Sequence, residues 1–198
     1  MTIVVGITGG IGSGKSTFSK EVTKRGYRLL DSDAQVANIY NNPTNDFLNY
    51  LKKINLGNSI NKRKINKKNI SKHIFFNTNT KKKLENYIFR IVRQKRSQFI
   101  KNEKKNKTKI VFLDIPLLFE NNLHKNLDLV ISIISSRKLR FNRLKKSKKI
   151  SKELFEGILK SQTSDVVRKK YSDIIIYNNS SMRMYLTKIN KTLDKIVK

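Results

Sequence analysis

Apolar residues gather into short runs that alternate with stretches of helical spacing. A β-branched run over residues 3–8 stops at a glycine, the pattern of a buried strand that leads into a turn. From Lys15 onward the spacing becomes helical, with Phe18 and Val22 four residues apart on one face. Gly26 is placed to end this helix, because glycine readily takes the left-handed conformation that follows a last turn. The first 26 residues therefore predict strand, glycine loop and helix.

Further strands follow along the chain. A second strand over 27–30 completes a βαβ unit, for which parallel pairing and a right-handed crossover are expected. Strand signals recur at 110–114, 129–134 and 174–177, and helices are predicted over 137–149, from 151 to 168, and from 181 to the end. Strands that alternate with helices predict a three-layer α/β fold with a mainly parallel sheet.

Residues 43–105 differ from the rest of the chain. They are rich in Lys and Asn, and Leu84, Ile88 and Val92 have the spacing of a helix with one apolar face. We predict a mostly helical insertion domain here, and a core domain formed by residues 1–42 and 106–198.

Composition excludes several kinds of site and indicates where the protein is expected to act. The chain has 198 residues and no cysteine, which excludes disulfides and thiolate metal sites. It has no run of roughly 20 apolar residues and no pattern of a secretory signal at its start. His73 and His124 are isolated, so neither is predicted to bind a metal. A cytoplasmic protein without a membrane partner is expected, with a monomer favoured.

The net charge is +30, from 44 Lys and Arg against 14 Asp and Glu. Such a charge attracts phosphate backbones and would suit a nucleic-acid binder. The excess is mostly Lys, however, and it occurs together with abundant Asn and Ile, which share A/T-rich codons. Compositional drift is the favoured explanation, and no specific nucleic-acid partner is expected.

The segment from Gly9 to Ser16 satisfies G-x-x-x-x-G-K-[ST] between a predicted strand and a predicted helix. Glycines let backbone N–H groups surround a polyphosphate, and the helix N-terminus adds its positive dipole end. Lys15 can bridge the β- and γ-phosphates of ATP, and Ser16 can ligate Mg²⁺. The predicted nucleotide-binding residues are Gly10, Ile11, Gly12, Ser13, Gly14, Lys15, Ser16 and Thr17. A glycine turn that binds nothing is the less favoured alternative.

Three aspartates follow predicted strands. Asp31 and Asp33 come after the second strand, at the edge where an open α/β sheet binds ligands. We predict that Asp33 orients an acceptor hydroxyl and takes its proton, as the catalytic Asp of kinases does. A helix cap is the alternative for either residue, and Asp31 could serve structure or function. Asp114 ends an apolar strand and is predicted to hold Mg²⁺ with Ser16.

A predicted basic helix and lid over about 137–150 carries Arg137, Arg140 and Arg143, three residues apart. We predict that they share one face, which could close over phosphates. A solvated basic helix is the alternative. Arg143 is the favoured catalytic and ATP-binding arginine, and Arg168 is a further predicted phosphate contact.

Several of these segments together resemble the dephospho-coenzyme A kinase family. The resemblance covers nearly the whole chain, and the motifs that carry it are Thr8–Thr17, Gly26 with Asp31-Ser32-Asp33, Asp114–Glu120 with its Pro-Leu-Leu-Phe-Glu, Ser161-Gln162, Arg168, and Ser172-Asp173 leading to Tyr177-Asn178-Asn179. Departures from the family pattern occur at Phe89-Arg90, where His-Pro is usual, at Ser147 in place of a lid arginine, and at Ser180 in place of a glycine.

The resemblance implies a P-loop NTPase core with a helical domain on the CoA side and a small lid. It also implies that ATP with Mg²⁺ phosphorylates the ribose 3′-hydroxyl of dephospho-CoA, the last step of coenzyme A synthesis. Asp33 would be the base, Arg143 the lid arginine and Arg168 the family's later arginine. The alternatives are a nucleoside or nucleoside-monophosphate kinase and, from another class, a basic nucleic-acid-binding ATPase.

Overall fold

The computed structural model describes residues 1–147 and 150–197, which form two compact units. The core unit comprises Met1–Asp31 and the described residues from Ile100 onward, and the helical unit comprises Ser32–Phe99. In the part of the chain so described, no helix combines the length and the apolar character that a bilayer span requires.

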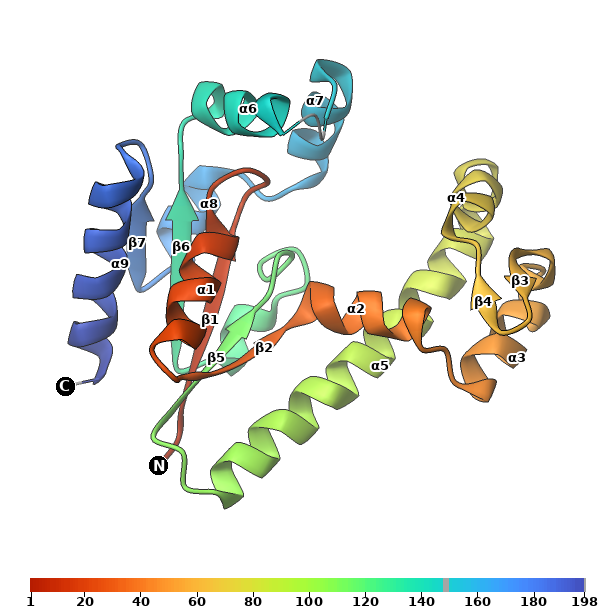
Figure 1. Cartoon of the computed structure of the whole chain (residues 1–198), viewed down its shortest axis with the longest axis horizontal. Coiled ribbons are helices and arrows are strands. Elements are labelled where there is room, and N and C mark those ends of the chain that lie inside the picture. Colours follow the sequence, from red (N-terminus) through yellow and green to blue (C-terminus); the bar gives the residue numbers. More distant parts are fainter. Residues whose placement is uncertain (148–149, 198) are drawn as a thin grey trace. The chain divides into compact units, whose positions relative to one another are not determined.

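Five parallel strands form the sheet of the core unit, in the order β2-β5-β1-β6-β7 (Figure 1). Their bounds are β1 (Ile3–Gly9), β2 (Arg28–Asp31), β5 (Ile110–Asp114), β6 (Leu129–Ile134) and β7 (Ile174–Tyr177). The central strand β1 pairs with both β5 and β6, so that Ile7 lies beside Asp114 on one side and Ile131 on the other. The predicted α/β fold with a mainly parallel sheet is confirmed.

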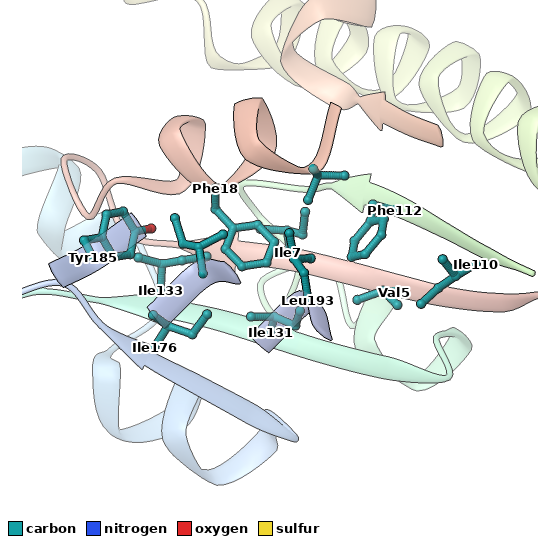
Figure 2. Packing of buried hydrophobic residues seen from close by; sticks show 12 residues of the cluster. Val5, Ile7, Phe18, Ile110, Phe112, Ile131, Ile133, Ile176, Tyr185 and Leu193 are labelled. Carbon is teal, nitrogen blue, oxygen red and sulfur yellow. The ribbon is translucent and has the colours of Figure 1, made fainter. Parts of the chain in front are cut away.

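Helices cover both faces of this sheet. The helices of the core unit are α1 (Lys15–Lys24), α6 (Arg137–Lys146), α7 (Lys152–Ser161), α8 (Asp165–Tyr171) and α9 (Met182–Val197), of which α1, α8 and α9 contact strands of the sheet. On one face, Phe18 of α1 and Tyr185 of α9 pack against Ile7 and Ile133 in a fully buried cluster (Figure 2). On the other face, α8 contacts β6, and Leu118 from the segment after β5 packs beneath Gly6. The sheet and the packed layers on its two faces therefore set the positions of the strand ends and of the loops that follow them.

Two predicted helices of the core unit differ from the observed ones. The helix predicted from 151 to 168 is two helices, because Ser164 accepts a hydrogen bond from Val167 N at 3.3 Å and starts α8. The helix predicted over 137–149 is α6, which ends at Lys146, and Lys148 and Lys149 lie outside the described residues.

The helical unit contains α2 (Ser32–Asn41), α3 (Asn45–Lys53), η1 (Gly57–Ser59), α4 (Lys67–Phe76) and most of α5 (Thr78–Lys105). The helical unit begins at Ser32, eleven residues before the predicted start at residue 43, because Val36, Ile39 and Tyr40 of α2 pack into its apolar cluster. A short hairpin of β3 (Ile60–Asn61) and β4 (Lys64–Ile65) was not predicted. Its turn uses Lys62 and Arg63 at positive φ, where sequence patterns expect Asn or Gly.

Candidate active site

The loop between β1 and α1 offers a row of backbone N–H groups. Gly12 and Gly14 both have positive φ, and Gly14 is the N-cap of α1. Within the described residues, no hydrogen-bond acceptor is present for the N–H groups of Gly12, Gly14, Lys15 and Ser16. These donors lie at the positive end of the α1 dipole, so the loop suits an anion such as a polyphosphate.

The carbonyl groups of the same loop accept hydrogen bonds from side chains of the second half of the chain. Four consecutive carbonyl oxygens accept hydrogen bonds: Ile11 O from Arg140 Nε at 2.8 Å, Gly12 O from Arg143 Nη1 at 3.3 Å, Ser13 O from Asn178 Nδ2 at 2.8 Å and Gly14 O from the Tyr185 hydroxyl at 3.0 Å. The C=O and N–H of one trans peptide point in opposite directions. Holding these carbonyls outward therefore turns the N–H groups of Gly12, Gly14 and Lys15 inward.

Two glycines are required by this close approach. A β-carbon at Gly14 would collide with the Asn178 amide, and one at Gly10 would collide with the Arg140 guanidinium. The N–H of Ile11 is held as well, because it donates to Gln162 Oε1 at 3.0 Å. The loop is thus shaped by side chains from the second half of the chain as much as by its own glycines.

Asp114 lies beside the loop at the end of β5 and is 2% exposed. One of its oxygens forms an ion pair with Lys15 Nζ, and the other accepts a hydrogen bond from the Ser19 hydroxyl at 2.6 Å. Ser16 is exposed in the first turn of α1. The described residues contain no group of three or more His, Cys, Asp or Glu that could hold a metal. A carboxylate and a hydroxyl nevertheless fit Mg²⁺, which prefers oxygen ligands and takes several of them from water and phosphates.

Asp31 and Asp33 lie on different elements. Asp31 is the last residue of β2 and pairs in register with Asp114 on β5. Asp33 is the second residue of α2, exposed in its first turn, and belongs to the helical unit. The strand predicted over 27–30 thus extends to Asp31, and Asp33 lies two residues beyond its end.

The three arginines of α6 do not form the single cationic face that their spacing predicted. Arg137 is exposed and pairs with Glu156 on α7, whereas Arg140 is 5% exposed and binds the loop. The Arg143 guanidinium also donates to Ser135 Oγ at 3.0 Å and Asn178 O at 2.8 Å. Since each step of three residues turns the side chain by about 60° around the helix, the first and last members of such a row face different neighbours.

Arg168 lies next to a pocket of about 400 Å³ that α6, α7, α8 and the ends of β6 and β7 enclose. Arg168 is 2% exposed, donates to Asp165 Oδ1 at 2.9 Å, and lies 3.8 Å from Glu120. In the part of the chain that the structure describes, its Nε and one Nη, like one Nη of Arg140, are buried and have no hydrogen-bond partner. Burial lowers the pKa of the Arg140 guanidinium, Asp165 raises it and Arg168 lowers it, yet arginine remains charged. The pocket is therefore lined by two buried arginines together with Asp165.

Several residues that shape the site had no assigned role in the sequence. Gln162 and Asn178 belong to motifs that carry the family resemblance, but their contacts with the loop follow from the fold alone. Arg140 was treated as one of a row of exposed cations. Tyr185 could have been recognised as buried from its four-residue spacing with Ile189 and Leu193, although nothing in that spacing indicates its bond to Gly14. In the segment after β5, Leu118 is buried, whereas Leu117 is 37% exposed.

Comparison with known proteins gives a consistent result. The family model for dephospho-CoA kinase matches residues 3–183. The dephospho-CoA kinase of Fusobacterium nucleatum is 32% identical over 201 residues, covering 98% of each chain. That of Blochmanniella pennsylvanica is 33% identical, covering 92% of this chain and 86% of the relative.

Solved structures agree with this match. The dephospho-CoA kinase from Campylobacter jejuni superposes with a TM-score of 0.76 at 27% identity, covering 99% of this chain and 98% of that one. At 15% identity, a shikimate kinase from Acinetobacter baumannii shares the fold, with a TM-score of 0.53. The phosphate-binding loop, its neighbouring carboxylate and these full-length matches together lead to one assignment: the chain belongs to the dephospho-CoA kinase family of P-loop kinases.

Proposed function

We propose that this chain transfers the γ-phosphoryl group of ATP to the 3′-hydroxyl of dephospho-CoA, the last step of coenzyme A biosynthesis. One observation carries the proposal. Four N–H groups of the loop have no acceptor among the described residues, and the loop also carries Lys15, which pairs with Asp114, in a chain that belongs to the dephospho-CoA kinase family. Phosphoryl transfer needs little covalent chemistry from the protein, so a rigid array of charges and donors can supply most of the catalysis.

On the donor side, the loop N–H groups bind the phosphates of ATP and Lys15 neutralises their charge. For this, the Lys15 ammonium must exchange some of its contact with Asp114 for phosphate oxygens. Ser16 and Asp114 would hold Mg²⁺, which neutralises phosphate charge when bound. The bond from Ser19 keeps the Asp114 carboxylate oriented during that exchange.

On the acceptor side, Asp33 orients the ribose 3′-hydroxyl and accepts its proton. This role is supported by its place in the chain, two residues after the strand that pairs with β5 beside Asp114. The helical unit, from Ser32 to Phe99, would bind the rest of dephospho-CoA. Its Phe89-Arg90 pair, which departs from the family pattern, would then belong to the acceptor-side domain.

Two arginines would supply further positive charge. Arg143 lies against Gly12 O, so its charge favours a polyphosphate bound in the loop. Arg168 lines the same pocket as Arg140, and its positive charge could stabilise the transferring phosphoryl group as negative charge spreads over its oxygens. We assign charge stabilisation to both.

A coupled assay of ADP release tests the reaction. We expect turnover with dephospho-CoA, and phosphorus NMR of the product should place the new phosphate on the 3′-oxygen. AMP, CMP and nucleosides should give no more than background. Faster turnover with a nucleoside or its monophosphate would favour that kinase class instead, and turnover that needs RNA would favour a nucleic-acid-dependent ATPase.

A monomer acting in the cytoplasm completes the proposal. A net charge of +30 opposes self-association at low ionic strength. Size-exclusion chromatography with light scattering should give the mass of one chain, 23.1 kDa, and twice that mass would contradict the monomer.

A further inference from the structure

Tyr185 lies in the first turn of α9, is fully buried, and reaches the loop across 171 residues of sequence. Its hydroxyl donates to Gly14 O, the carbonyl that also accepts the first two hydrogen bonds of α1, from Thr17 N and Phe18 N. Tyr185 therefore contacts the residue at which the phosphate-binding loop becomes a helix.

The bond to Gly14 O determines the direction of one phosphate-side donor. The Gly14 carbonyl and the Lys15 N–H belong to the same planar peptide and point in opposite directions. A donor that holds the carbonyl outward therefore holds the Lys15 N–H toward the phosphate side. Asn178 acts in the same way one peptide earlier, since its bond to Ser13 O fixes the direction of the Gly14 N–H.

The ring and the hydroxyl of Tyr185 are both suited to such a role. The ring packs in the core cluster with Phe18 and Ile133 and lies at one end of that cluster (Figure 2), so the position of the hydroxyl is set by rigid neighbours. Burial raises the pKa of the hydroxyl above its ordinary value, and the opposing effect of Arg143 is smaller. The hydroxyl consequently keeps its proton and remains a donor throughout the neutral range.

We infer that Tyr185 is a positioning residue for ATP: its hydroxyl holds the Gly14–Lys15 peptide with the amide toward the phosphates, and so makes nucleotide affinity depend on the docking of α9. Tyr185 acts through the peptide and does not contact the substrate. The inference rests on the proposed use of ATP as donor, and it is independent of the identity of the acceptor.

The test is Tyr185→Phe in the full chain, which removes one oxygen and keeps the ring. Gly14 O keeps its bonds from Thr17 N and Phe18 N, and losing the bond from the hydroxyl should raise Kd and KM for ATP by up to about tenfold. The KM for dephospho-CoA should stay within about twofold, because none of the contacts that change lie in the helical unit. Calorimetric titration with ATP and steady-state kinetics measure these quantities.

A matched control is Tyr27→Phe. Tyr27 packs against Phe112 in the same cluster, 5.6 Å between ring centroids, and also loses only a hydroxyl. The Tyr27→Phe protein should bind ATP with the same affinity as the wild type. A Tyr185→Phe protein with a lower Tm but an unchanged Kd for ATP would overturn the inference, because that is the signature of a purely structural hydroxyl.

A second readout does not depend on activity. In the nucleotide-free protein, Tyr185→Phe should shift the amide resonances of Lys15 and Ser16 more than those of β5, which is remote from the hydroxyl. Unshifted amides at Lys15 and Ser16 would refute the inference. If the wild type itself failed to bind ATP, the proposed function would fall; if both proteins bound ATP equally, only the inference would.

Discussion

Arg140 and Arg143 show how the role of a residue depends on its surroundings. Both were recognised from the sequence as cations near a phosphate site, and both donate to consecutive carbonyls of the loop. Their charge therefore lies near the loop, as the sequence predicted, but the hydrogen bonds named here go to the protein backbone. The same guanidinium can shape the loop and supply positive charge to it, since each Arg has five donors.

Asp33 is the proposed base for the acceptor hydroxyl. Asp33→Asn removes the proton acceptor and keeps the size of the side chain, so kcat should fall about 10²- to 10⁴-fold. The Kd for ATP should stay within about twofold, because the donor loop belongs to the other unit.

Asp46→Asn is a matched control for that variant. Asp46 is likewise exposed in the first turn of a helix of the same unit, and its loss should leave kcat unchanged. Near-normal turnover by Asp33→Asn would remove Asp33 as the base.

Arg140 and Arg137 offer a comparison on one helix. Arg140→Met removes a buried donor from Ile11 O and an ion pair with Asp165, and should lower the free energy of unfolding by about 1–3 kcal/mol. Arg137→Met loses an exposed pair with Glu156 and should be close to neutral. Urea unfolding followed by circular dichroism measures both variants. Equal destabilisation would mean that burial of the Arg140 guanidinium contributes nothing.

At the level of elements, the sequence predicted strands, helices and loops best where a periodic pattern and a local signal agree. Most strands of the sheet were predictable because β1, β5, β6 and β7 are rich in β-branched residues, and the loop before α1 was predictable from its glycines. The break between α7 and α8 and the β3–β4 hairpin were missed. Ser164 caps a helix that has no apolar period of its own, and Lys62 and Arg63 adopt a turn that their side chains do not favour.

The candidate site was predictable in part for the same reason. The loop, Lys15 and Asp114 lie in local motifs, and their proximity follows from parallel pairing of β1 with β5. The bonds from Asn178 and Tyr185 join segments more than 160 residues apart. No local pattern encodes such contacts, because tertiary packing creates them.

The end of α5 provides a prediction about pH. Glu103 is buried, accepts from the Thr108 hydroxyl at 2.7 Å and from Arg28 Nε at 3.0 Å. The Thr108 bond lowers the pKa of Glu103 below its ordinary value of 4.5, burial opposes this, and Arg28 adds to the lowering. A carboxylate with a lowered pKa stabilises the fold above pH 4.5, and that contribution is lost as the pH falls through the folded-state pKa.

Glu103→Gln should therefore reduce the free energy of unfolding at neutral pH and flatten its decline below pH 4.5. Urea unfolding across the acid range measures this. Glu85→Gln is the control, because Glu85 is half exposed on the same helix and lies 3.9 Å from Lys81. If the free energy of unfolding of Glu103→Gln fell in acid as steeply as that of the wild type, other carboxylates would be the cause of that decline.

For the whole molecule, the net charge of +30 remains the most unusual property. If it reflects composition alone, single-stranded RNA should bind at about 50 mM salt and dissociate by about 200 mM, as counterion release predicts. ADP release should not rise when RNA is added. Fluorescence anisotropy with a labelled oligonucleotide, run beside the kinase assay, measures both. Binding that persists at high salt and stimulates ATP turnover would show that the charge has a function of its own.

The bonds that hold the loop carbonyls also have a consequence for biosynthesis. The loop is translated early, yet its four partners are encoded between 129 and 171 residues later. Ribosomes release the N-terminal part of a chain first, so a nascent chain exposes the glycine loop long before Tyr185 has been made. Until α9 has been added and packed, the loop peptides lack the bonds that orient them. We therefore expect that the ability to bind ATP appears only after α9 has been synthesised and packed.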